Sequence, residues 1–163
     1  FYESVNFAIL HKLPVLFICE NNLYSVYSDL SVRQPVGRKI HEMVSSFGMK
    51  SVHGNGNKVL EVSEKVKIAK DNIHKGEGPQ FLEFDTYRWR EHCGPNYDND
   101  IGYREESEFL EWQKKDPLAD FLSDDKFSES FKADINEEIQ AAHAFAEDSP
   151  FPSDLDYQSI INS

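Results

Sequence analysis

The sequence predicts an α/β protein with a doubly wound, mainly parallel sheet, and the alternation of its elements carries this prediction. Residues 15–19 form an apolar run with the length of a strand, residues 80–87 form a second strand-like segment rich in aromatic side chains, and 49–53 have the character of a short strand between them. The segments before and between these runs place apolar residues three or four positions apart, as helices do. Alternating helices and strands are typical of parallel sheets that helices cover on both faces.

Apolar spacing and residues that end helices support the first three helices. Residues 1–11 and 59–74 have apolar side chains at helical spacing, and Pro14 separates the first helix from its strand. Residues 39–47 form a short amphipathic helix that Gly48 terminates.

The C-terminal third is predicted to be helical and acidic. Helices are expected at 105–115 and 133–147, with a shorter one beginning near Asp116 and Pro117, since proline is tolerated in a first turn. We expect one domain over residues 1–163, in which 105–163 form an acidic helical C-terminal region.

Charge and composition narrow the class of protein. Residues 1–94 carry 12 Lys and Arg against 11 Asp and Glu, whereas 95–163 carry 5 against 18. An acidic surface disfavours a phosphate backbone, so we expect no nucleic acid partner; the acidic residues are solvated helix faces or a docking surface for a basic partner. Two cysteines and the lack of a leader or membrane span indicate a soluble, cytoplasmic protein.

The run from Leu13 to Tyr24 contains the main candidate site. Its apolar part has the composition of a strand buried on both faces, and it stops at Asn21, Asn22 and Tyr24. Ligands of parallel sheets bind beyond the carboxyl ends of the strands, and amide oxygens suit a hard cation such as magnesium beside a phosphate. Alternatively, the two asparagines only form a turn.

A second long polar loop, 88–103, follows the strand at 80–87 and is expected to open on the same edge. It carries Arg88, Arg90 and His92, so His92 is either a donor to an anionic ligand or a solvated loop histidine. The sequence has no Gly-x-Ser-x-Gly elbow, phosphate-binding Gly-rich loop with Lys, or paired-cysteine zinc spacing.

Several collinear motifs resemble one family. The stretch FYESVNFAILHKLPVLFICENNLYS is similar to the second half of the thiamine diphosphate motif in alpha subunits of 2-oxo acid dehydrogenases, the decarboxylating components of the pyruvate, branched-chain and acetoin complexes. Further resemblances follow in the same order as in the family: GNGN at 54–57, KGEGPQFLEFDTYR at 75–88, IGYR at 101–104 with DPL at 116–118, and AAHAFAEDSPFP at 141–152.

The resemblance implies a three-layer α/β sandwich with the thiamine diphosphate-binding fold and C-terminal helices. It implies that Asn22 is the side-chain ligand of magnesium, that Tyr24 supplies a backbone carbonyl ligand, and that His92 contacts the cofactor's diphosphate at the catalytic site. The implied enzyme is an oxidoreductase with a disulfide acceptor. It would act on a 2-oxo acid as an alpha2beta2 heterotetramer with a beta subunit and transfer the acyl group to the lipoyl domain of an acyltransferase.

Two departures from the family pattern matter. The Gly-Asp-Gly that opens the motif, and whose Asp is another magnesium ligand, is absent, so we expect these 163 residues alone to be inactive. Around His92, Arg90 and Glu91 bring charge to the mouth of the site and Cys93 replaces a serine, which leaves the 2-oxo acid open, a polar one included. The alternatives are a transketolase-like or decarboxylase enzyme with the same cofactor but no lipoyl transfer, or an inactive assembly fragment.

Overall fold

The computed structural model describes residues 1–119 and 129–153, which belong to two compact units, Phe1–Pro117 and Leu118–Ser163. The first unit contains, in chain order, α1 (Tyr2–Leu10), β1 (Leu16–Asn21), β2 (Tyr24–Ser25), β3 (Ser28–Asp29), the 3₁₀ helix η1 (Leu30–Val32), α2 (Ile40–Ser46), β4 (Lys50–Asn55), α3 (Val59–His74), β5 (Gln80–Asp85) and α4 (Glu106–Gln113). The second contains α6 (Glu129–Asp148).

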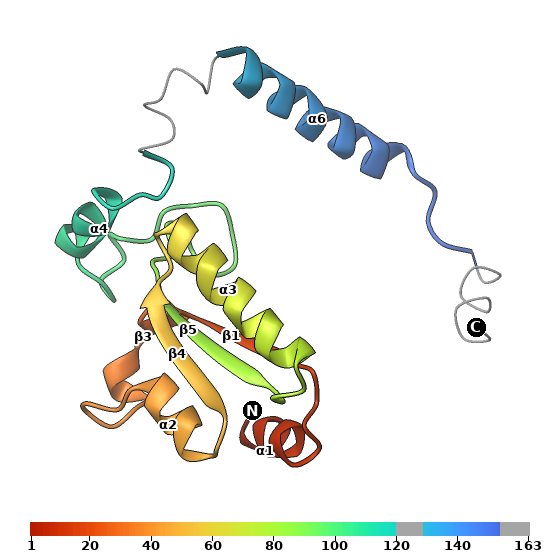
Figure 1. Cartoon of the computed structure of the whole chain (residues 1–163). Coiled ribbons are helices and arrows are strands. Elements are labelled where there is room, and N and C mark those ends of the chain that lie inside the picture. The colour runs from red at the N-terminus through yellow and green to blue at the C-terminus, as the bar shows by residue number, and fades with distance from the viewer. Residues whose placement is uncertain (120–128, 154–163) are drawn as a thin grey trace. The chain divides into compact units, whose positions relative to one another are not determined.

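The main sheet is parallel, with the strand order β1-β5-β4 (Figure 1). Asn21 and Asn55 both pair with Asp85, so the three strands end in register at one edge. The predicted parallel sheet is therefore confirmed for the first unit, and the loops that follow β1 and β5 leave from the same edge.

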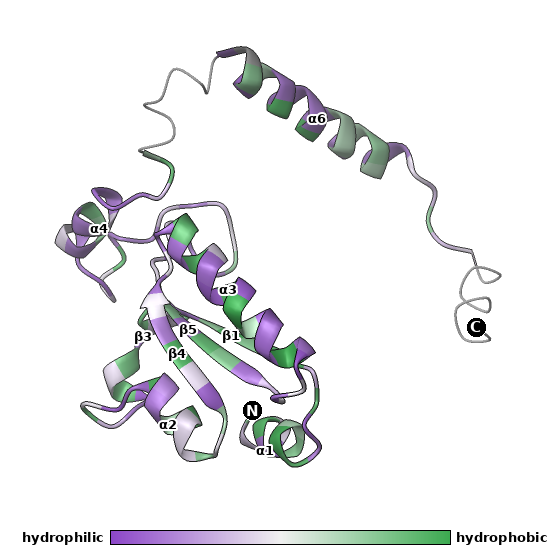
Figure 2. Ribbon diagram, in the orientation of Figure 1, coloured by the Kyte–Doolittle hydropathy of each residue, from purple (hydrophilic) through white to green (hydrophobic). Residues whose placement is uncertain are grey.

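Helices cover both faces of this sheet. On one face, Val5 of α1 and Val44 of α2 pack with Phe81 of β5 in a buried cluster. On the other face, Ala69 of α3 packs with Leu82 and Phe84. Hydrophobic and hydrophilic residues alternate along α3 in Figure 2, as expected for a helix with one buried side.

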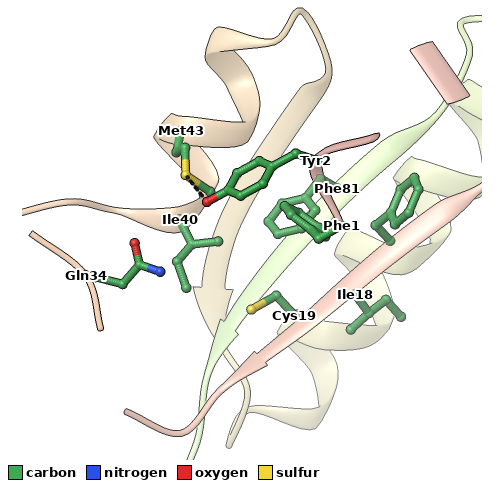
Figure 3. A pocket seen from close by; sticks show the side chains of 9 residues that line it. Phe1, Tyr2, Ile18, Cys19, Gln34, Ile40, Met43 and Phe81 are labelled. Carbon is green, nitrogen blue, oxygen red and sulfur yellow. Dashed lines mark hydrogen bonds between the residues drawn. The ribbon is translucent and has the colours of Figure 1, made fainter. Parts of the chain in front are cut away.

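The prediction that the first strand is buried on both faces is wrong. In the described part of the chain β1 is an edge strand, whose one neighbour is β5, and the side chain of Ile18 is 53% exposed. Beside it lies an open apolar cavity of about 490 Å³, lined among others by Tyr2, Ile18, Met43 and Phe81 (Figure 3). An apolar strand without a second neighbour leaves such surface uncovered.

Other element bounds differ modestly from the sequence prediction. The loop that follows β1 contains a small hairpin, because β2 pairs with β3 in antiparallel fashion, and it also contains η1. The strand β4 runs to Asn55, and β5 ends at Asp85 rather than at Tyr87. The short helix predicted to begin near Asp116 and Pro117 runs toward residues 120–128, which lie outside the described residues.

In the second unit, α6 begins at Glu129, earlier than predicted, and ends at Asp148. Its apolar side chains Ile135, Ile139 and Phe145 are exposed. Among the helices that the structure describes, none is long and apolar enough to span a membrane.

Candidate functional site

The turn at the end of β1 is built from two successive asparagines. The Asn21 Oδ1 accepts a hydrogen bond from the Leu23 backbone N–H at 3.2 Å, and the Asn22 Oδ1 accepts one from the Tyr24 N–H at 3.0 Å. Asparagine favours such turns because its side chain reaches the backbone two residues on. Leu23, between Asn22 and Tyr24, has a φ of 65°, a conformation that residues other than glycine adopt rarely.

The side chain of Tyr24 is anchored away from this turn. Its hydroxyl donates to the Glu108 Oε2 of α4 at 2.5 Å, and burial together with this hydrogen bond raises the pKa of the phenol well above its usual range. Its ring packs edge-on against that of Tyr103 at 5.4 Å. The phenol is therefore committed to packing, and only the backbone of Tyr24 is left to meet a ligand.

The second loop is held by a buried carboxylate that the sequence analysis did not single out. Asp98 is 2% exposed and forms ion pairs with Arg104 and, at 3.4 Å, with Arg88. The Tyr103 hydroxyl donates to its Oδ2 at 2.6 Å, and burial and this hydrogen bond raise the pKa of Tyr103 to about 12. Asp98 thus pins both ends of the loop that carries His92.

The two loops contact each other at the carboxyl edge of the sheet, the edge on which the sequence predicts both to open. The Arg88 Nη2 donates to the backbone carbonyl of Val26 at 3.2 Å, in the turn between β2 and β3. Tyr103 packs against both Tyr24 and Tyr27, with ring centroids 5.4 and 5.3 Å apart. Contacts from one loop therefore fix the position of the other.

His92 lies on an exposed stretch of the second loop, next to the exposed Cys93. The charges beside it are engaged within the loop itself. The Arg90 guanidinium stacks on Tyr97, 4.0 Å from the ring centroid, and donates to the Pro95 carbonyl at 2.8 Å. The Glu91 Oε1 likewise accepts from the Asn96 amide at 2.8 Å.

Two buried acids, Asp98 and Glu83, were missed by the sequence analysis. Asp98 lies in a run of Asn and Asp that suggests only turns, so the sequence offers no sign of its burial. For Glu83 a signal existed, because it is a lone carboxylate among the apolar residues Phe81, Leu82 and Phe84 of the strand. A buried acid in such a strand requires hydrogen-bond partners.

The turn at Asn22 is chemically suited to a hard cation. Its amide oxygen accepts one hydrogen bond and keeps a second lone pair, and the side chain is half-buried rather than freely mobile. Within 1–119 and 129–153, no three His, Cys, Asp or Glu side chains are grouped to hold a metal. Magnesium needs no such group, because it takes one or two protein oxygens together with phosphate oxygens and water.

The fold and the site define a class of protein: an α/β protein with a polar, oxygen-rich turn at the carboxyl edge of a parallel sheet, where such proteins bind ligands. The sequence profile of the family described as "Dehydrogenase E1 component" matches residues 1–153. The chain belongs to this family.

Named relatives agree with this membership. The chain is 35% identical to the 2-oxoisovalerate dehydrogenase subunit alpha of Bacillus subtilis, over 96% of this chain and 50% of that protein. It is 34% identical to the chloroplastic pyruvate dehydrogenase E1 component subunit alpha-3 of Arabidopsis thaliana, over 93% of this chain and 36% of that protein. It is 33% identical to the pyruvate dehydrogenase E1 component subunit alpha of Staphylococcus aureus, over 87% of this chain and 41% of that protein. The chain thus spans half or less of the length of these relatives.

Proposed function

We propose that these residues belong to the alpha subunit of a thiamine diphosphate-dependent 2-oxo acid dehydrogenase, which decarboxylates its substrate and transfers the acyl group to a lipoyl group. The observation that carries the proposal is the Asn22–Tyr24 turn at the carboxyl edge of the sheet, in a chain of the dehydrogenase E1 component family. We further propose the complete three-layer thiamine diphosphate-binding fold for the whole protein.

Three residues would hold the cofactor. Asn22 would give its amide oxygen to magnesium, and Tyr24 its backbone carbonyl. His92, on the exposed stretch of the second loop, would donate to the diphosphate. Bound thiamine diphosphate supplies the carbanion and the electron sink of the reaction. The task of this chain is then to orient the cofactor and to neutralise its diphosphate.

Contacts within the second loop support a cofactor-binding role for His92 but not a substrate-binding role for Arg90 or Glu91. The ion pairs of Asp98 hold the loop closed, so His92 is presented on an ordered segment rather than on a free coil. Since Arg90 and Glu91 are paired with groups of the same loop, we do not assign either to the recognition of the 2-oxo acid. The substrate therefore stays open within that class.

We also propose that the alpha chain works with a beta subunit in a heterotetramer and with the lipoyl domain of an acyltransferase. The experiment is to assemble the full-length alpha chain with its beta subunit, add magnesium and thiamine diphosphate, and offer pyruvate, branched-chain and polar 2-oxo acids. The expected result is reduction of a lipoyl domain together with release of CO₂.

The same assay separates the alternatives. Release of free aldehyde without lipoyl reduction indicates a decarboxylase, and transfer of a two-carbon unit to an aldehyde acceptor indicates a transketolase-like enzyme. An assembled complex without turnover on any of these substrates indicates an assembly fragment. Each of these three outcomes contradicts the proposed dehydrogenase.

A further inference from the structure

Glu83 is a buried carboxylate at the centre of the sheet, and it is 3% exposed. It lies on the central strand β5, in register with Cys19 of β1 and His53 of β4. A charge in such a place is retained only when hydrogen bonds replace the lost water.

The carboxylate of Glu83 connects three segments of the chain. Its Oε1 accepts from the Asn21 Nδ2 at 2.7 Å, at the end of β1. Its Oε2 accepts from the backbone N–H of His41 at 2.7 Å and lies 2.7 Å from the His41 Nδ1, at the start of α2. Because a carboxylate only accepts, that Nδ1 carries the hydrogen.

These contacts define the orientation of the Asn21 amide. With its Nδ2 given to Glu83, its Oδ1 faces the turn and accepts from the Leu23 N–H at 3.2 Å. The next residue, Asn22, accepts from the Tyr24 N–H at 3.0 Å. The first hydrogen bond of the candidate magnesium turn is therefore made by the Asn21 amide, which Glu83 holds in one orientation.

We propose that Glu83 is a positioning residue for the candidate magnesium turn, acting through Asn21 on Asn22 and Tyr24 and tying that turn to the start of α2. This inference rests on the proposed function of the turn. Glu83 itself touches neither Asn22 nor Tyr24 by any hydrogen bond between the described residues, so its effect passes through the Asn21 amide.

The substitution Glu83→Gln tests the orientation directly. Glutamine offers one acceptor and one donor group in the same shape. His41 presents two donors, its backbone N–H and its Nδ1–H, so the glutamine oxygen stays with His41. The glutamine NH₂ then faces the Asn21 Nδ2, and the Asn21 amide must flip. The NH₂ of Asn21 then meets the Leu23 N–H, and the turn loses the hydrogen bond that begins it.

The measurement uses the full-length alpha chain assembled with its beta subunit. The concentration of magnesium that gives half-maximal binding of thiamine diphosphate should rise on the order of tenfold or more in Glu83→Gln, as for other groups that orient a metal ligand. Asn21→Ala should show a similar rise. The double variant should show little more than either alone, because both changes remove the same link. Glu42→Gln, an exposed acid of α2, is the matched control and should leave binding unchanged.

A lowered melting temperature with unchanged magnesium dependence would show that Glu83 is only structural, and additive effects of the two substitutions would show that it does not act through Asn21. Either result overturns the inference. Amide hydrogen exchange at Leu23 and Tyr24, measured without cofactor, should also accelerate in Glu83→Gln, and unchanged exchange overturns it too. This readout stands even if the wild-type enzyme fails to bind thiamine diphosphate, a result that would refute the proposed function instead.

Discussion

The ion pairs of Asp98 predict how firmly the His92 loop is closed. Asp98 and the side chain of Arg104 are almost completely buried, and Arg88 and Tyr103 complete the set of partners. Asp98→Asn removes the negative charge and leaves the buried guanidinium of Arg104 uncompensated. Removing one partner of a buried pair costs about 3–5 kcal/mol, and because asparagine keeps one acceptor we expect about 3 kcal/mol.

At about 1.4 kcal/mol per factor of ten, this loss corresponds to a roughly hundredfold larger population of the open loop. The assay is amide hydrogen exchange of the full-length alpha chain, followed by mass spectrometry on peptides that cover residues 90–103. When the loop closes faster than its open form exchanges, exchange in these peptides should accelerate on the order of a hundredfold. Peptides of β5 should keep their protection.

Asp100→Asn is the matched control, since it makes the same chemical change at an exposed position of the same loop. Its exchange should stay within a factor of about two of the wild type, because exposed substitutions change stability by about 0.5 kcal/mol or less. If Asp98→Asn and Asp100→Asn behave alike, the buried ion pairs do not close the loop and the explanation is refuted.

Three further predictions concern single side chains. His92→Ala should abolish most activity of the assembled enzyme without lowering its melting temperature, because the residue is exposed; wild-type turnover would remove it from the site. Gly56→Ala should destabilise the full-length chain by about 1–3 kcal/mol in urea unfolding, since the new Cβ would lie 2.9 Å from the Asp85 carbonyl oxygen, and an unchanged midpoint would contradict this close contact. Burial raises the pKa of Cys19 to about 11, so about one Cys19 thiol in a thousand is ionised at pH 8. Iodoacetamide should therefore modify the exposed Cys93 of the 163-residue chain before Cys19, and equal rates of modification would contradict this.

The sequence was sufficient where the signal is local. Periodicity located α3 and aromatic composition located β5, each to within two residues, and the polar end of the first apolar run located the turn at Asn21 and Asn22. Alternation of helices and strands predicted the parallel sheet, because few other arrangements bury such elements. The helix, the strand and the turn depend on neighbours that lie within a few positions along the chain, and the sheet follows from the order of these elements.

The sequence was insufficient where partners are distant or a strand's neighbours are unknown. Glu83 is paired with His41, 42 positions away, and no pattern around either residue announces the other. An apolar run such as β1 has the same composition in the centre and at the edge of a sheet, so its exposure could not be anticipated. Only the three-dimensional structure shows that Asp98 is buried between two arginines rather than part of a solvated turn.

The most direct test of the account is the magnesium dependence of thiamine diphosphate binding to the assembled enzyme, measured by isothermal titration for the wild type and for Asn22→Ala. The matched control is Asn6→Ala, at an exposed position of α1. We predict that Asn22→Ala weakens binding at limiting magnesium on the order of tenfold or more and that excess magnesium partly restores it, whereas Asn6→Ala has no effect. Identical magnesium dependence in all three proteins would contradict the assignment of the turn after β1 as the cofactor's anchor.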